Sequence, residues 1–124
     1  MSETVTRRTA GQQAEACALR HLDSQGLTLV ARNWSCTRGE LDLVMLDGDT
    51  VVFVEVRYRR HSAWGGAAAS VDARKQQKLA LAAQSFLQQH PRLAQHPCRF
   101  DVIALNGDPG NNPPLDWFKN AFDS

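Results

Sequence analysis

Apolar residues recur along the chain at two different spacings. Helical spacing predicts a helix over residues 9–24, with Gly26 as its cap, and a second helix that begins at Ser70 or Asp72 and ends near His90. Runs rich in β-branched residues predict strands at residues 27–31, 41–46, 51–58 and 99–105. Residues 116–122 predict a short amphipathic turn that docks Trp117, Phe118 and Phe122 on the core. The predicted order is α-β-β-β-α-β, which places the chain in the α/β class.

The second and third predicted strands form a β-hairpin. Asp47-Gly48-Asp49-Thr50 separates them, and Asp-Gly tolerates the positive φ that tight hairpin turns require. If the turn is two residues long, four charged residues share one face of the hairpin at the end away from the turn: Glu40, Asp42, Glu55 and Arg57. The other face is then apolar throughout, with Leu41, Leu43 and Met45 opposite Val52, Val54 and Val56.

Three carboxylates on one face of this hairpin repel each other and are costly to desolvate. Arg57 can neutralise one of them, and a divalent cation would satisfy the rest. A cluster of salt bridges at the edge of the sheet, with Glu40 and Asp42 in water, explains the same pattern. The hairpin alone leaves both interpretations open.

Composition describes an ordinary globular domain. The 124 residues are 43% hydrophobic and 22% charged, and we expect one domain over residues 9–122 after a disordered segment at 1–8. Three cysteines without a CxxC pair favour reduced thiols and a cytoplasmic location. No apolar run is long enough to span a membrane, and the polar N-terminus does not resemble a signal peptide.

Positive charge is concentrated in the first two thirds of the chain, although the formal net charge is only +1. Arg59 and Arg60 begin a loop of small residues that could follow a phosphate backbone or pack against the next helix. In that helix, the core stripe of Leu79, Ala82, Ala83, Phe86 and Leu87 extends back to Lys75. Lys75 is therefore expected on the inward side of the first helical turn, with Lys78 beside it.

The order of these elements, with an acid on the second strand and Glu-x-basic on the third, resembles the PD-(D/E)XK superfamily of restriction-endonuclease-like nucleases. Four segments narrow the resemblance to the uncharacterised YraN family, which is commonly likened to archaeal Holliday-junction resolvases: GELDLV, VFVEVRYRR, GGAAAS before a Lys-rich helix, and CRFDVIAL. The resemblance covers roughly residues 11–122. It implies a restriction-endonuclease-like core, a mixed central sheet flanked by helices.

The resemblance also implies roles for individual residues. Asp42 and Glu55 match the two metal-binding acids, and Glu15 matches an acid on the first helix that completes such sites. Glu40 would be an auxiliary ligand or an outer-shell partner. Arg57 stands where the superfamily has Lys, and it joins Asp42, Glu55 and Lys75 in the implied catalytic set. The implied nucleic-acid-binding residues are Arg38, Arg59, Arg60, Lys75, Gln77 and Lys78.

The expected function is metal-dependent hydrolysis of DNA phosphodiester bonds, on branched or structured DNA, with Mg²⁺ or Mn²⁺ as cofactor. Oxygen ligands suit these cations, which would polarise the phosphoryl oxygen and activate water. A homodimer is expected by likeness to resolvases. Two other functions fit the same residues. One is a catalytically inactive module that binds nucleic acid, and the other is a protein-interaction scaffold whose acids form only salt bridges.

Overall fold

A computed structural model describes the backbone of residues 3–59 and 71–122, and the side chains of residues 9–58 and 71–122. Two α-helices, five β-strands and two short 3₁₀ helices follow each other along these residues. In order they are α1 (Glu3–Ser24), β1 (Thr28–Cys36), β2 (Gly39–Asp47), β3 (Thr50–Arg59), α2 (Ala73–Gln89), η2 (Leu93–Gln95), β4 (Cys98–Asn106), η3 (Pro109–Asn111) and β5 (Leu115–Phe122).

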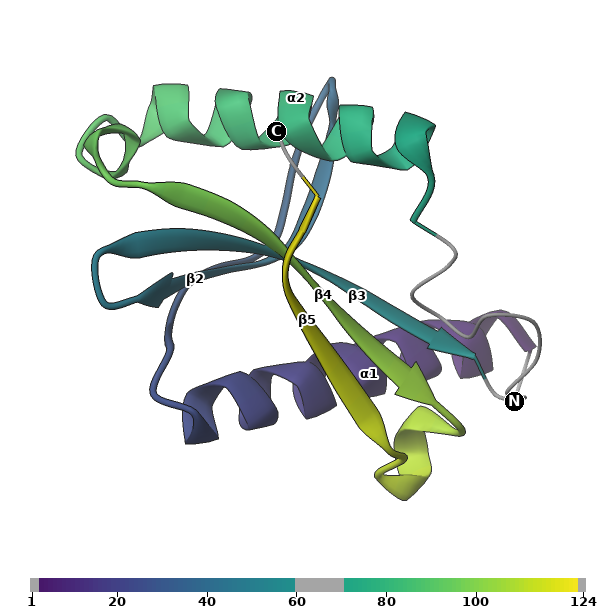
Figure 1. Cartoon of the computed structure of the whole chain (residues 1–124). Coiled ribbons are helices and arrows are strands. Elements are labelled where there is room, and N and C mark those ends of the chain that lie inside the picture. Colours follow the sequence, from purple (N-terminus) through teal and green to yellow (C-terminus); the bar gives the residue numbers. More distant parts are fainter. Residues whose placement is uncertain (1–2, 60–70, 123–124) are drawn as a thin grey trace.

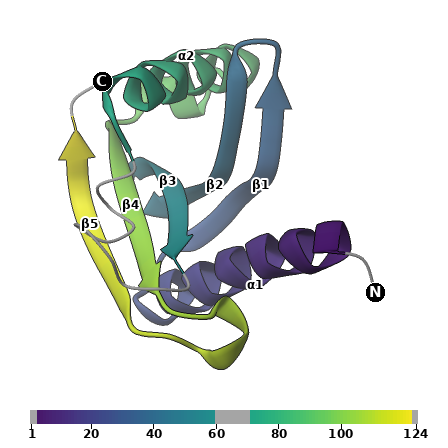
Figure 2. The same ribbon diagram turned by 90° about the vertical axis from the view of Figure 1, so that its right-hand side faces the viewer.

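The strands form a single mixed sheet in the order β1-β2-β3-β4-β5. The β1/β2, β2/β3 and β4/β5 pairs are antiparallel, and β3/β4 is parallel. A parallel pair needs a crossover connection, and α2 lies within it. The helices α1 and α2 lie on opposite faces of the sheet, which is strongly twisted between them (Figures 1 and 2). The expected mixed sheet flanked by helices is therefore present.

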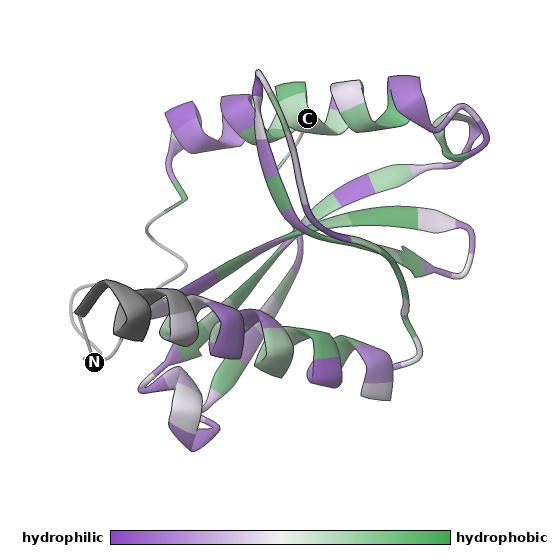
Figure 3. Ribbon diagram, turned by 180° about the vertical axis from the view of Figure 1, so that it is seen from behind, coloured by the Kyte–Doolittle hydropathy of each residue, from purple (hydrophilic) through white to green (hydrophobic). Residues whose placement is uncertain are grey.

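Each face of the sheet has its own hydrophobic core. Leu43, Met45, Val52 and Val54 pack with α1, whereas Val44, Val51 and Phe53 pack with α2. Consecutive residues of one strand thus point to opposite helices, as the period of two in a strand requires. Seen from behind, the strands between the helices carry many hydrophobic positions (Figure 3).

The hairpin turn is two residues long, which is the length that the predicted grouping of charged residues on one face required. Asp47 pairs with Thr50, Leu46 with Val51 and Leu43 with Val54 around Gly48-Asp49, and Gly48 has a φ of 60°. The prediction of an all-apolar face is wrong at one position, because Leu41 packs on the α2 side while Leu43 packs on the α1 side. Pairing between β2 and β3 ends at Leu43 and Val54, and beyond that point β2 follows β1 instead.

Residues 116–122 form a strand rather than the predicted short turn, and Phe118 is 43% exposed rather than docked on the core as predicted. This strand, β5, pairs with β4 and supplies hydrogen-bond donors to the carboxylate of Asp101, which is fully buried. Asp101 accepts hydrogen bonds from Trp117 Nε1 and from the backbone N–H of Asn120, both at 2.9 Å, and it pairs with Arg99 at 3.0 Å. A buried carboxylate with several donors fixes the edge strand in place, a long-range effect that local sequence does not reveal.

Two other elements are longer than predicted. The backbone is helical from Glu3 rather than from Thr9, and β1 continues to Cys36 rather than ending at Ala31. The extra length of β1 contains Asn33, whose φ is 53°, a conformation that asparagine tolerates. In the part of the chain that the structure describes, no helix combines the length and apolarity needed to cross a membrane.

Candidate functional site

The candidate site lies where β2 separates from β3. Past the last paired residues, the Asp42 carboxylate accepts a hydrogen bond from the backbone N–H of Val56, with 2.9 Å between Oδ2 and N. This bond uses a backbone donor of β3 beyond the point where β2 and β3 stop pairing. It also holds the Asp42 side chain at the gap between the two strands, within reach of both helices.

Glu55 lies on β3 and is hydrogen-bonded to Asp42, and we call these two residues the carboxylate pair. Only 5% of Glu55 is exposed to solvent. Burial, the hydrogen bond with Asp42 and the negative charge of Asp42 together raise the pKa of Glu55 to about 8, against the opposing charges of Lys75 and Arg57. The pair as a whole therefore retains a proton at neutral pH.

Two cations face the carboxylate pair. Lys75 Nζ lies 3.7 Å from Glu55 Oε2, and the positive charge of Arg57 also acts on Glu55. Asp72 sets the start of α2, because its side chain caps the backbone N–H of Lys75 at 2.9 Å. The predicted inward position of Lys75 is confirmed, and four of the five predicted stripe residues are buried below it: Leu79, Ala82, Ala83 and Phe86.

Glu15 approaches the same pair from α1. Burial and the negative charge of Asp42 raise the pKa of Glu15, although Asn33 and Arg32 lower it, and its Oε1 lies 3.7 Å from Arg32 Nε. Oε1 is buried and accepts no hydrogen bond. Within the described residues, no group of three or more His, Cys, Asp and Glu side chains is arranged so that it could hold a metal ion.

A basic groove of about 510 Å³ opens beside the carboxylate pair. It runs between the β1–β2 turn and the first turns of α2, and its charged lining residues are Arg38, Glu40, Lys75 and Lys78. Gly39 allows the turn to approach α2 closely, since a Cβ there would lie 3.3 Å from the carbonyl oxygen of Lys78. Lys75 belongs both to this groove and to the surroundings of Glu55.

The predicted residues divide into three groups. Asp42, Glu55, Arg57, Lys75 and Glu15 are brought together, as the resemblance implied. Arg38, Lys78 and Glu40 line the basic groove, whereas Gln77 is exposed and lines neither site. The side chains of Arg59 and Arg60 lie outside the described residues, as does the loop that they begin.

Two residues that interact with Glu15 could not be picked out from the sequence. They are Arg32 and Asn33. Both lie in β1 beyond the strand predicted at residues 27–31, so their direction relative to α1 could not be assigned. The available signal was Asn33 itself, because asparagine adopts a positive φ more readily than most residues and so marks an irregular strand.

Comparison with known proteins gives one consistent result. The model of the family described as "Uncharacterised protein family UPF0102" matches residues 14–105. A UPF0102 protein of Pseudomonas syringae pv. syringae is 69% identical over 119 residues, which cover 96% of this chain and 97% of that protein. UPF0102 proteins of Stutzerimonas stutzeri and Pseudomonas aeruginosa are 65% and 59% identical, and both matches span the full length of both chains.

Proposed function

The chain belongs to the UPF0102 family, and from its site we propose that it is a metal-dependent endonuclease that hydrolyses phosphodiester bonds in DNA. We place the domain in the restriction-endonuclease-like superfamily on the order of its elements and the motifs on β2 and β3. The YraN-like resemblance of its motifs agrees with membership of this family. The superfamily and the activity are what we propose.

One observation carries the proposal: two carboxylates, of which Glu55 is buried, contact each other at the point where two strands separate, with cations on one side. Glu55 is 5% exposed, and Lys75 stands 3.7 Å from it. A salt-bridge cluster built only for stability would pair each acid with a base. Here Glu55 contacts another acid as well as Lys75, and burial together with the contact with Asp42 raises the pKa of Glu55 to about 8. Such paired acids with perturbed pKa values are typical of functional sites.

The donor set suits a hard divalent cation. Asp42 and Glu55 supply carboxylate oxygens, and Mg²⁺ commonly takes one or two carboxylates while retaining waters and substrate phosphates as its other ligands. A preformed cage of three protein ligands is therefore not required. Glu15, whose buried Oε1 accepts no hydrogen bond, is the candidate for an outer position around the pair. When bound, the cation would lower the pKa of a water and polarise the phosphoryl oxygen.

The residues of the chain contribute positioning and charge. The backbone N–H of Val56 fixes Asp42, and Asp42 in turn orients Glu55. Lys75 and Arg57 can stabilise the negative charge that develops on the non-bridging oxygens when water attacks phosphorus. The P–O bond to the leaving group then breaks, and the products are a phosphate monoester and a free hydroxyl. Lys78 and Arg38, in the basic groove, would hold the neighbouring phosphates.

The test is a cleavage assay with Mg²⁺ or Mn²⁺ on linear, single-stranded, flapped and four-way DNA of the same sequence. Asp42→Asn is the informative variant, because an amide oxygen can still accept the Val56 hydrogen bond while the charge is lost. Asp49→Asn, on the exposed hairpin turn, is the matched control. We expect wild type and Asp49→Asn to cleave and Asp42→Asn to lose cleavage while keeping the wild-type melting temperature.

Three results would overturn the proposal. If wild type binds DNA in a salt-dependent way but cleaves none of the substrates with either metal, the protein is a nucleic-acid-binding module that has kept the fold without catalysis. If binding is also missing, the acids serve a structural or protein-interaction function. Equal cleavage by wild type and Asp42→Asn would mean that the activity resides elsewhere.

A further inference from the structure

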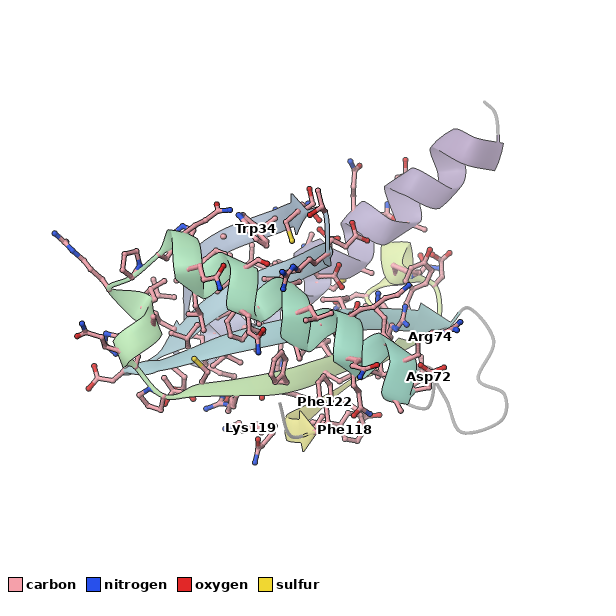
Figure 4. All side chains as sticks on the ribbon, turned by 90° about the horizontal axis from the view of Figure 1, so that it is seen from above. Trp34, Asp72, Arg74, Phe118, Lys119 and Phe122 are labelled. Atoms are coloured by element: carbon pink, nitrogen blue, oxygen red, sulfur yellow. The ribbon has the colours of Figure 1, made fainter. Side chains whose placement is uncertain are left out.

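A second groove, of about 440 Å³, lies on the other side of the carboxylate pair from the basic groove. We call it the aromatic groove, since Phe118 and Phe122 of β5 line it together with Val102 of β4 and Gln76 of α2. Figure 4, viewed from the side of α2, shows Phe118, Lys119 and Phe122 at the β5 edge of the sheet beside that helix. Neither the predicted site residues nor the proposed reaction uses this groove.

Strand register connects the aromatic groove directly to the carboxylate pair. Glu55 on β3 is the partner of Val102 on β4, and Val102 is the partner of Phe118 on β5. Partners in register point to the same face of a sheet, so the three side chains form one row under the start of α2. Neighbouring strands are about 4.8 Å apart, which places Phe118 roughly 10 Å from Glu55 along the row.

The start of α2 serves both grooves. Lys75 faces Glu55 and lines the basic groove, and the next residue, Gln76, lines the aromatic groove. The Gln76 amide is oriented by a hydrogen bond from its Nε2 to the Val71 carbonyl oxygen at 3.3 Å. From the basic groove to the aromatic groove, the order is therefore the cations of the basic groove, the carboxylate pair, the Gln76 amide and the Phe118 ring.

Phe118 is unusual among the apolar residues of the described chain. It is 43% exposed, and the other large hydrophobic residues exposed to a similar degree, Leu29 and Leu81, are aliphatic. An exposed aromatic ring next to a cation-lined phosphate path is the arrangement that single-stranded nucleic-acid sites use, because every base has a flat face that can stack on it. A base inside a continuous duplex is already stacked on its neighbours and cannot enter such a groove.

We propose that the aromatic groove receives an unpaired base next to the phosphate held at the carboxylate pair, so that the substrate is a strand with at least one unpaired nucleotide. This inference rests on the proposed nuclease function and narrows its substrate class. The rise per nucleotide is about 3.4 Å in duplex DNA and greater in an extended strand. The roughly 10 Å between Glu55 and Phe118 is therefore spanned by a few nucleotides at most.

The test measures binding in EDTA, so that it does not depend on metal or cleavage. Fluorescence anisotropy gives the Kd for a labelled 12-nucleotide single strand and for the blunt duplex of the same sequence, at low salt. Wild type should bind the single strand more tightly than the duplex. Phe118→Ala should weaken single-strand binding about 5- to 150-fold, the range for one lost stacking contact, and leave duplex binding unchanged.

Two further variants complete the design. Phe118→Trp keeps an aromatic face and should retain the single-strand preference, which also guards against a fold defect in the alanine variant. Leu29→Ala removes a side chain of similar exposure, 41%, from the opposite edge of the sheet, and should change neither Kd. Melting temperatures of all three variants should match wild type within a few degrees.

The outcomes separate this inference from the function on which it rests. Salt-dependent binding with equal affinity for both forms, unchanged by Phe118→Ala, would overturn the unpaired-base inference and leave the nuclease proposal standing. It would then leave the groove to a different occupant, such as an apolar side chain of a protein partner. Absence of salt-dependent binding to either form would overturn both.

Discussion

Lys75 at the start of α2 reaches Glu55 on β3, with 3.7 Å between Nζ and Oε2, although Glu55 already shares a proton with Asp42. The ammonium group therefore does not suffice to ionise Glu55. This leaves a pair of acids that retains a proton, with a cation beside it. An added divalent cation would favour the ionised form of Glu55, and the predictions below depend on that balance.

Metal binding should require the carboxylate pair. Titration of Mn²⁺ into wild type, followed by calorimetry, should show a site that is absent in the combined Asp42→Asn and Glu55→Gln variant. The reason is that both substitutions remove a charged oxygen ligand and conserve side-chain size. Glu40→Gln, which changes an exposed acid in the basic groove, should keep the site. Equal binding by wild type and the double variant would contradict the assignment.

Stability without metal should fall as pH rises through the neutral range. Glu55 has a pKa of about 8 in the fold against an ordinary value of 4.5, so between these values the folded chain holds a proton that the unfolded chain has lost. The stabilisation of the fold by this extra proton is complete below pH 4.5 and is lost as the pH approaches 8. Relative to Glu55→Gln, wild type should lose up to about 4 kcal/mol of unfolding free energy across this range.

The measurement is urea unfolding in EDTA at several pH values for wild type and Glu55→Gln. Glu15 has a pKa raised in the same direction, so its contribution remains in both proteins and cancels in the difference. Two unfolding curves that shift in parallel with pH would show that Glu55 does not titrate in this range. Mg²⁺ should reduce the loss, because it binds the ionised pair.

Arg57 should act through its charge rather than through proton transfer, because a guanidinium remains protonated at any practical pH. Arg57→Lys should therefore keep substantial cleavage. Arg57→Ala should lose on the order of 10²–10³ in rate, the usual scale for one electrostatic stabiliser. If Arg57 serves only to neutralise Glu55 for folding, Arg57→Ala should instead lower the melting temperature and leave the turnover of folded protein nearly unchanged.

Cations of the basic groove should contact phosphates without reading sequence. Removing Arg38 or Lys78 should weaken binding similarly for unrelated DNA sequences and reduce the slope of log K against log salt by about one for each contact. Arg92, exposed beyond the far end of α2, provides a control whose loss should leave the slope unchanged. A variant that alters sequence preference but not the slope would argue for base contacts instead.

Asp101 should matter for folding and not for catalysis. Asp101→Ala leaves the Trp117 N–H and Arg99 without their buried partner, and it should destabilise the protein by about 3 kcal/mol. Asp116→Ala, an exposed acid on the same edge strand, should change stability by no more than about 0.5 kcal/mol. The check is chemical denaturation, with cleavage per folded molecule as the second readout.

Local patterns predicted the elements whose signals are local. The Asp-Gly turn and β-branched runs gave the β2–β3 hairpin, and the apolar stripe gave α2 together with the inward position of Lys75. The grouping of Glu15 with Asp42 and Glu55 followed from the family resemblance, since nothing in residues 9–24 indicates which strand that helix covers. Sequence thus located most of the candidate site.

The remaining features depend on contacts between distant segments. β5 forms because Trp117 and Asn120 donate to Asp101, a residue 16 and 19 positions away. Leu41 lies on the other face because the part of β2 before Leu43 pairs with β1 and not with β3. The aromatic groove requires both β5 and the start of α2, so its row of Glu55, Val102 and Phe118 could not be assembled before the strand register was known.

The irregular end of β5 also affects how the molecule meets its neighbours in a concentrated solution. β5 is an outer strand of the sheet, and such strands can template addition of a strand from another molecule. Asn120, with a φ of 52°, interrupts the strand, and its N–H is already engaged by Asp101. Edge-to-edge polymerisation through β5 is therefore disfavoured, and weakening the Asp101 contacts should make the protein prone to aggregation before it unfolds globally.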